Sequence, residues 1–329
     1  MTKVLKGIWG PVLLIIALWS AKFWLSLPFA TELAVYSIYV MGCNLLYGYL
    51  GMVSFGQPVY LCVGAYTTAI YLAYLGQNPL VAILMGLLAG FVVGFALGPP
   101  FVRLRGDYFA LVNLATCAIG YFMVTKLFIG ITGGEDGLWY RTRMGVLPIL
   151  DLRHPSKFFI FALLVALGTL IVYKYLIEST FGVSCLAVKV NERKMRFLGY
   201  NAFQIKWAGF VLATMLSALS GSLFAVNFGF VNPSLSEPIR AGEVLIATLL
   251  GGAGTVYGPF FGAFAFLGIK NVVSKYIIAK WELYMGILTI LVLFRFEKGL
   301  WGNIEAIIKE RFVGKRRGPS SLKGELGFK

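Results

Sequence analysis

The feature that most constrains this chain is a series of about ten apolar stretches, each long enough to form a membrane helix. A helix needs roughly 20 consecutive apolar residues to cross a hydrocarbon core about 30 Å thick. Hydrophobic residues make up 59% of the 329 residues and charged residues only 13%, which is more apolar surface than a water-soluble domain can bury. The sequence therefore predicts an all-α integral membrane protein with crossings near residues 8–27, 32–50, 57–75, 79–99, 107–128, 158–177, 206–228, 240–256, 258–276 and 283–298.

The basic residues indicate how these helices are oriented, because Lys and Arg are enriched in cytoplasmic loops. Ten crossings with a cytoplasmic N-terminus place 19 of the 29 Lys and Arg on the inner side, together with the loop 178–205. We therefore expect both termini in the cytoplasm. The stretch 8–27 follows Lys3 and Lys6 as in a signal peptide, but no clean cleavage site follows it, and we expect it to be retained.

The net charge of +15 does not indicate nucleic-acid binding, because the basic residues lie between and after the apolar stretches instead of forming one polar domain. The anionic inner surface of a membrane explains their placement. Residues 1–308 are predicted to be one transmembrane permease domain. Residues 309–329 are rich in basic residues, Gly and Ser, and are predicted to be a flexible cytoplasmic tail near anionic lipid.

Small residues at every fourth position predict close packing between helices. Two runs have this spacing: Gly86, Gly90, Gly94 and Gly98, then Gly254, Gly258 and Gly262. The four cysteines have no metal-binding or redox spacing and are interpreted as buried core residues, and His154 is interpreted as a solvated loop residue. We predict no catalytic residue, metal site or cofactor in this chain.

Polar residues inside apolar stretches are costly in a bilayer, so each of them is a candidate for function. Six are candidates for lining a substrate path: Asn44, Ser54, Gln57, Tyr60, Thr67 and Asn113. Gly and Pro interrupt the helical pattern from Gly51 to Pro58, which fits either a functional break or a tight turn that Ser54 caps. For Asn44 and Asn113, bonding to other helices and bonding to a substrate are both open.

Glu243 lies deepest among the carboxylates and follows Arg240 by three residues. An ion pair between these two residues is the favoured interpretation, and a proton relay is the alternative. The Gly-rich loop 130–143, with two adjacent acids, is typical of a mobile surface on the outer side. It could contact a delivery protein or form part of a gate.

The densest interior cluster of charge is VKVNERKMRFLGYN, residues 188–201, on the predicted cytoplasmic side. Asn191 is a suitable N-cap for a short helix over 192–198, and Gly199 is suitable for ending it in a left-handed turn. Met195 and Leu198 are three residues apart and are predicted to share an apolar face. Such a helix suits a groove in another protein, and its basic residues equally suit anionic lipid.

Four blocks, in order and at natural spacing, carry a family resemblance: NLLYGYLGMVSFGQPVYLCVGAYTTA (44–69), LRGDYFALVNLA (104–115), ITGGEDGL (131–138), and ESTFGVSCLAVKVNERKMRFLGYN through LLGGAGTVYGPFFGA (178–263). They resemble the M-type permease subunits of ABC importers for branched-chain amino acids. The resemblance implies a fold like that of type II importer permeases and a cytoplasmic segment that docks onto an ATP-binding subunit. Thr180, Val183 and Leu186 depart from the family pattern. The residues assigned to coupling, from this pattern and the predicted helix, are Ser179, Phe181, Gly182, Asn191, Glu192, Met195, Leu198, Gly199 and Asn201.

The resemblance also implies the partners: two ATP-binding subunits, a second permease chain expected to be a paralogue, and an extracytoplasmic substrate-binding protein, in the cytoplasmic membrane of a prokaryote. ATP hydrolysis is then expected on a partner, since the chain has no GxxxxGK[ST] phosphate loop and is not expected to be an enzyme. Leu, Ile and Val are the expected substrates. The alternatives are an importer for urea or short amides, and an ion-coupled secondary transporter that uses Glu243.

Overall fold

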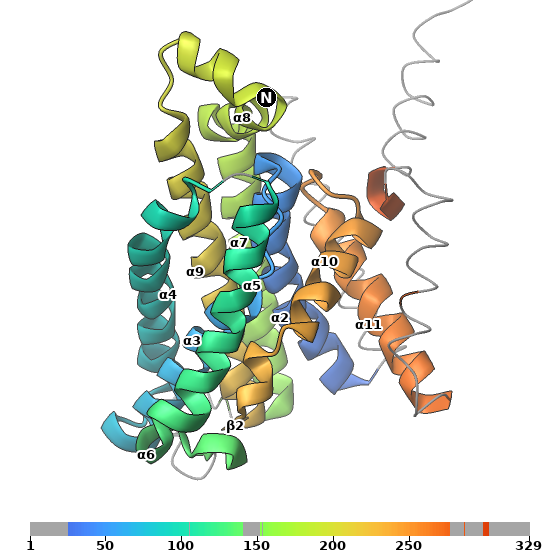
Figure 1. Ribbon diagram of the computed structural model, residues 1–329. Helices are drawn as coiled ribbons and strands as arrows, with labels where there is room; N and C mark the ends of the chain where they lie inside the picture. The colour runs from blue at the N-terminus through green and yellow to red at the C-terminus, as the bar shows by residue number, and fades with distance from the viewer. Residues whose placement is uncertain are drawn as a thin grey trace, which may run out of the picture.

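The computed structural model of the protein describes residues 26–104, 106–140, 152, 154–276, 286 and 299–302. Six helical segments in this part are long and apolar enough to cross a membrane (Figure 1). They are α2 (Leu27–Asn44) with its π-helical extension η1 (Leu45–Leu50), α3 (Gln57–Ile70) with η2 (Tyr71–Leu75), α4 (Pro79–Phe101), α5 (Asp107–Phe122) with η3 (Met123–Leu127), α7 (Pro155–Glu178) and α9 (Ala202–Phe228). These segments match six predicted crossings and confirm a multi-pass helical fold.

The predicted crossings 8–27 and 283–298 fall almost wholly outside the described residues, and so does the tail 309–329. The count of ten crossings and the cytoplasmic position of both termini therefore stay predictions.

The predicted crossing 240–256 contains a shorter helix than expected. Helix α10 (Ile239–Gly251) has 13 residues, which at about 1.5 Å per residue is too short to cross the membrane alone. It follows a two-residue strand, β2 (Phe230–Val231), and a 3-10 turn, η6 (Pro233–Ser236). The approach to α10 is therefore not α-helical. Helix α11 (Gly258–Tyr276) is helical as predicted and packs against α10.

The outer loop is more ordered than the sequence predicted. Residues 129–139 form a short helix, α6 (Ile129–Thr132), a 3-10 turn, η4 (Gly134–Asp136), and a strand, β1 (Leu138–Trp139). Strand β1 pairs antiparallel with β2, and the buried Tyr140 hydroxyl donates a 2.6 Å hydrogen bond to the Ala225 carbonyl of α9. These residues form a folded cap at the end of α9, residues 141–143 of the predicted loop lie outside the described part of the chain, and the loop's mobility stays a prediction.

Helix α9 lies at the centre of the bundle and packs against α2, α3 and α4 (Figure 1). The four glycines of α4 that were predicted to form a packing seam are all buried. A Cβ atom at Gly90 would overlap with the Ala218 side chain, and one at Gly94 with the Thr214 hydroxyl. This seam confirms the close packing that the glycine spacing predicted.

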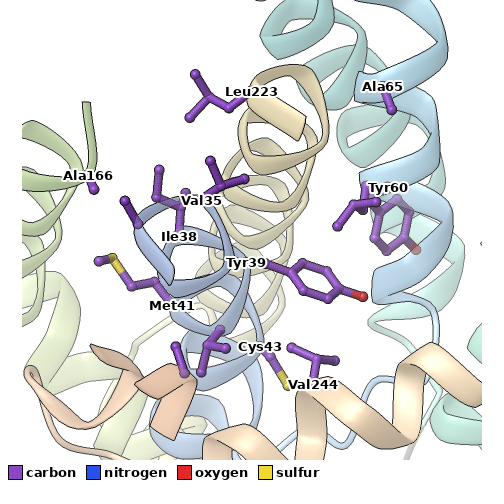
Figure 2. Close-up of a cluster of buried hydrophobic side chains, with 14 of the residues drawn as sticks. Val35, Ile38, Tyr39, Met41, Cys43, Tyr60, Ala65, Ala166, Leu223 and Val244 are labelled. Atoms are coloured by element: carbon purple, nitrogen blue, oxygen red, sulfur yellow. The ribbon is translucent and has the colours of Figure 1, made fainter. Parts of the chain in front are cut away.

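Helix α2 is buried on nearly every side, between α9, α3, α7 and α10 (Figure 2). Val35, Ile38 and Met41 belong to its core, and the Tyr39 ring points into the space between α3 and α10. All four cysteines are buried and unpaired, which confirms their interpretation as core residues.

Candidate functional site

Four of the six residues predicted to line a substrate path meet in one buried polar layer. The Asn113 amide of α5 donates to the Phe109 carbonyl at 2.8 Å. Its Oδ1 accepts hydrogen bonds from the hydroxyls of Ser54, at 3.4 Å, and Tyr60, at 3.2 Å. Gln57 lies beside this cluster, and its Oε1 accepts from the Ser217 hydroxyl of α9. We call Ser54, Gln57, Tyr60, Asn113 and Ser217 the polar layer.

The polar layer lies at a break between two helices. Residues 51–56 are not helical, and α3 begins at Gln57, whose side chain is fully buried. Ser54 is also buried, and its hydroxyl accepts from the Gly56 N–H, so it does not cap α3. The segment is a six-residue connection between two crossing segments, which agrees with the predicted turn except that Ser54 does not cap α3. The segment is a break inside the protein, where polar side chains meet the freed backbone groups.

The other two path candidates lie elsewhere. The Asn44 amide donates to the Tyr173 hydroxyl and to the Thr255 carbonyl, both at 2.9 Å, and its Oδ1 accepts from the Gly254 N–H at 2.8 Å. These contacts join α2 to α7 and to the α10–α11 connection, so Asn44 bonds across helices. Thr67 is half-buried on α3, seven residues beyond Tyr60, and has no hydrogen bond to the described residues of the polar layer.

A cavity of about 400 Å³ lies on one side of the polar layer. Its walls come from the break, the start of α5 and helix α8 (Thr180–Phe197). Lys189 of α8 lines it and donates a 2.7 Å hydrogen bond to the Gly48 carbonyl at the end of α2. We call this the α8-side cavity.

A second cavity, of about 60 Å³, lies on the other side of the polar layer. The order of residues along two segments places the layer between the two cavities. On the stretch 50–61, residues 50–53 and Phe55 line the α8-side cavity and Leu61 lines the second one. On α9, Lys206 precedes Ser217 and Ser220 follows it in the same order. We call the second cavity the charged cavity, because four ionisable residues line it: Glu32, Arg240, Glu243 and Lys270.

The ion pair predicted between Arg240 and Glu243 is wrong. Lys270 of α11 donates to both carboxylate oxygens of Glu243, at 3.0 and 3.2 Å. The guanidinium of Arg240 points elsewhere, and its Nε donates to the Ser234 carbonyl at 2.8 Å. Glu243 is therefore neutralised by a partner 27 residues away in sequence, as a pairing role required.

Helix α8 lies at one end of the bundle and bends at Asn191, whose backbone is extended (φ −158°, ψ 95°) (Figure 1). The Asn191 side chain accepts from the Lys194 N–H at 3.0 Å, so it caps the second half of α8 as predicted. Gly199 has a φ of +85°, and the Tyr200 N–H donates to the Met195 carbonyl, so the helix also ends as predicted.

The remaining coupling candidates shape this segment. Ser179 caps the first half of α8 by accepting from the Phe181 N–H, and Asn201 caps α9 by accepting from the Gln204 N–H. A Cβ atom at Gly182 would overlap with the Ile177 carbonyl, so this position requires glycine. Phe181 is half-buried. Most of the predicted coupling residues therefore hold the segment in shape.

The predicted contact face of Met195 and Leu198 is exposed at Leu198 but wrong for Met195. Met195 is only 7% exposed and packs against Val188 and Ala202, inside the chain. Leu198 is 72% exposed and Phe197 is 90% exposed. Val190 and Tyr200 are exposed beside them. Phe197, Val190 and Tyr200 were not among the predicted coupling residues. Large apolar side chains within a charged stretch were the signal that could have identified them.

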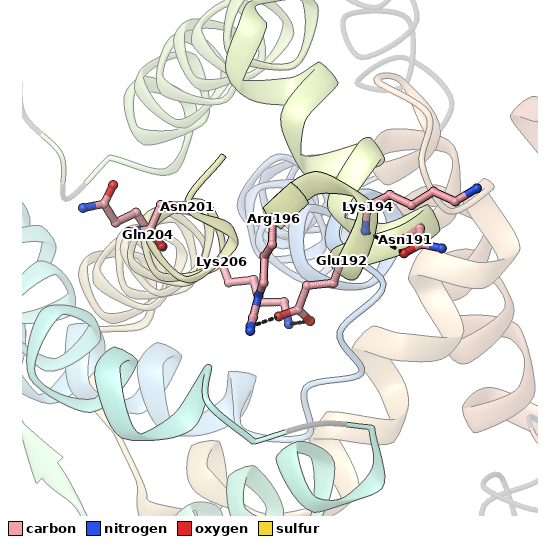
Figure 3. A network of polar contacts seen from close by, with 7 residues as sticks. All are labelled: Asn191, Glu192, Lys194, Arg196, Asn201, Gln204 and Lys206. Carbon is pink, nitrogen blue, oxygen red and sulfur yellow. Dashed lines mark hydrogen bonds and ion pairs between the residues drawn. The ribbon is translucent and has the colours of Figure 1, made fainter. Parts of the chain in front are cut away.

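Glu192 ties the second half of α8 to α9 (Figure 3). Its carboxylate pairs with Arg196 on its own helix and with the nearly buried Lys206 of α9. Burial alone would raise the pKa of Glu192, but the hydrogen bonds and charges of Lys206 and Arg196 outweigh it and hold the pKa below its ordinary value. This ion-pair network fixes the orientation of the exposed tip of α8, which consists of Phe197 and Leu198.

Comparison with known proteins gives consistent matches. A family model described as "Branched-chain amino acid transport system / permease component" matches residues 25–295. The chain is 28% identical to the high-affinity branched-chain amino acid transport system permease protein LivM of Salmonella typhimurium. The match covers 72% of this chain and 61% of LivM. It is 23% identical to LivH of Escherichia coli, covering 83% of this chain and 92% of LivH.

Another relative has a different substrate in its name. The nucleoside ABC transporter permease protein NupC of Lactococcus lactis is 23% identical over 69% of this chain and 79% of its own length. No solved structure matches the chain.

Proposed function

This chain belongs to the family of permease components of branched-chain amino acid transport systems, and from that membership we propose that it is a permease subunit of an ATP-driven importer for Leu, Ile and Val. Its membrane is the cytoplasmic membrane of a prokaryote. The chain forms part of the translocation path and converts ATP-driven movement of its partners into movement of its own helices.

The observation that carries this proposal is the exposed apolar tip of α8. Phe197 and Leu198 stand out at one end of the bundle, on a short helix that Asn191, Gly199 and the Glu192 ion pairs hold rigid. Large exposed apolar side chains on a rigid polar scaffold are typical of a protein docking site. We propose that this tip docks onto an ATP-binding subunit, and that α8 faces the cytoplasm.

The same helix reaches the proposed path. Lys189 lies on the first half of α8, bonds the end of α2 and lines the α8-side cavity next to the break at 51–56. A movement of the docked tip therefore has a direct mechanical route to the polar layer. The side chains of the polar layer are buried and packed, and we propose that the layer is the closed point of the path.

The partners follow from the same proposal. Similarity to both LivM and LivH supports a second, paralogous permease chain. Two ATP-binding subunits and an extracytoplasmic binding protein complete the importer, and ATP hydrolysis belongs to the ATP-binding subunits. Substrates such as urea, short amides or nucleosides are the alternative within the same class. For an ion-coupled transporter, the pairing of Glu243 with Lys270 removes the carboxylate that the alternative relied on.

The docking proposal is tested by co-purifying the ATP-binding subunits with the permease pair. Phe197→Asp and Leu198→Asp place a charge on the tip without touching the buried side of the segment, since both side chains point outward. We expect each to lower the amount of co-purified ATP-binding subunit and leucine uptake about tenfold or more, the scale of losing one central apolar contact in an interface.

The matched control is Leu75→Asp, which introduces the same charge at a leucine that is 73% exposed at the end of η2. It is expected to leave ATPase co-purification unchanged. Wild-type amounts of ATP-binding subunit with both tip variants would refute the docking role of α8.

A further inference from the structure

The charged cavity has a lining that the proposed function leaves unexplained. It is formed by α2, Leu61 of α3, the C-terminal half of α9, the turn before α10, the start of α10, and α11. Two carboxylates and two cations line it, so its formal charge is balanced. Ionisable groups inside a membrane protein are costly, and they are tolerated where they pair with each other or serve a site.

Only two of these four charged residues form an ion pair within the described part of the chain. Glu243 and Lys270 bond each other. Glu32 makes no ion pair with any described residue, and among the described residues Arg240 bonds only the carbonyl and hydroxyl of Ser234. One carboxylate and one guanidinium therefore remain available in the lining.

Two tyrosine hydroxyls add an independent sign of a ligand. Tyr36 and Tyr39 line the cavity, and neither hydroxyl has a hydrogen-bond partner among the described residues. The Tyr39 side chain is only 2% exposed, and Figure 2 shows its hydroxyl directed into the space between α3 and α10. A buried hydroxyl without a partner costs free energy, so a group that bonds it stabilises the site.

We propose that the charged cavity binds the head of an aliphatic α-amino acid as a zwitterion, with the carboxylate on Arg240 and the ammonium on Glu32. Arg suits a carboxylate because its planar guanidinium can donate two parallel hydrogen bonds. The tyrosine hydroxyls complete the shell, and Leu61, Phe224 and Leu267 of the lining offer apolar contact to the side chain. The cavity lies on the side of the polar layer away from α8, so it receives substrate before the layer opens.

Size and charge select this class of ligand. A volume of about 60 Å³ holds roughly four waters, close to the size of an ammonium and a carboxylate joined by one carbon. A balanced lining offers no net attraction to a simple anion or cation, whereas opposed charges align a zwitterion. Urea and nucleosides carry neither charge. This inference rests on the proposed import function and names the step at which the permease itself recognises the substrate.

The test is photo-crosslinking with the diazirine analogue of leucine. The complete permease–ATPase complex is reconstituted in lipid without a binding protein, illuminated with the probe, and the labelled peptides are identified by mass spectrometry. We expect label on the stretches that contain Tyr36, Tyr39 or Phe224, and we expect excess leucine to suppress it. Isopentylamine, 4-methylpentanoate and urea, each lacking one or both charges, are expected not to suppress it.

Arg240→Gln and Glu32→Gln are expected to lower labelling about tenfold or more, the effect of losing one charge-assisted hydrogen bond. Tyr39→Phe removes only a hydroxyl that has no partner in the described protein, so the variant is expected to fold, and labelling is expected to fall severalfold. The control is Lys157→Gln, which removes a positive charge at the exposed start of α7.

Leucine uptake by the wild-type complex, measured with its binding protein present, separates the two proposals. Absence of uptake overturns the proposed import function. Normal uptake together with unchanged labelling in Arg240→Gln and Tyr39→Phe overturns only the cavity proposal. Equal suppression by isopentylamine or 4-methylpentanoate overturns its zwitterion specificity.

Discussion

Asn44 and Asn113 show how one residue type serves two places in the same bundle. Asn44 bonds α2 to α7 and to the backbone after α10, and its three side-chain hydrogen bonds to described residues all reach other segments. Asn113 donates to its own helix and accepts from the break and from α3. Only the second amide lies between two cavities. The cost of burying an amide is therefore met in both cases, but only Asn113 is placed where a path could open.

Glu192 carries a prediction about pH. Its folded pKa lies below the ordinary value of 4.5, so its contribution to stability is complete above that value and is lost as the pH falls through the lower folded pKa. Glu192→Gln removes this contribution. We expect the variant to melt a few degrees below the wild-type complex at neutral pH, and the difference to shrink as the pH falls below 4.5.

Thermal melts of the purified complex in detergent across this pH range measure the effect. Glu178→Gln is the control, because the side chain of Glu178 is mostly exposed and its contact with Lys174 is long, at 3.9 Å. A melting difference for Glu192→Gln that stays constant from neutral to acidic pH would contradict the assignment of the ion pair.

At the scale of elements, the close contact between α4 and α9 can be tested by enlarging one of its glycines. Gly90→Ala adds a methyl group that overlaps with Ala218, and α4 must shift to admit it. We expect a loss of about 1–3 kcal/mol in the free energy of unfolding. Reversible unfolding in mixed detergent micelles measures it.

Gly168→Ala is the matched control within another crossing helix. A Cβ atom at Gly168 meets no described atom within 4 Å, and alanine favours a helix over glycine by up to about 1 kcal/mol. This variant is expected to be neutral or more stable. Equal destabilisation by both substitutions would mean that the seam does not depend on its glycines.

Helix α8 shows what local sequence can predict about an element. Asn191 and Gly199 were identified as helix ends because capping and left-handed turns depend on the residue and its nearest neighbours. The inward face was not identified, because Met195 is buried by Val188 and by Ala202 of the next helix. A spacing of three residues predicts which side chains are neighbours, and the second helix decides which of them is covered.

At the scale of the whole molecule, two cavities separated by a packed layer predict a change in accessibility during transport. All four native cysteines are buried, so the wild-type protein provides a low background for thiol labelling. We expect Ser54→Cys, in the polar layer, to react slowly with a water-soluble maleimide in the resting complex. During ATP turnover with the loaded binding protein, the reaction is expected to become about tenfold faster or more.

Thr214→Cys is the control for general loosening, since Thr214 is equally buried but faces the α4 seam instead of the layer. Its reaction is expected to stay slow in both states. Equal rates for Ser54→Cys at rest and during turnover would show that the layer is not the closed point of the path.

The sequence by itself determined six crossing helices, the glycine seam of α4, the ends of the second half of α8 and the family. Each of these depends on the length of an apolar run, on a spacing within one helix, or on chemistry between close neighbours. Tertiary structure alone decided that Lys270 pairs with Glu243, that the break at 51–56 lies inside the protein, and that Glu32 and Arg240 share a cavity with Tyr39. These contacts join residues on different helices, and in a bilayer the packing of one helix against another, which no single apolar run encodes, brings such residues together.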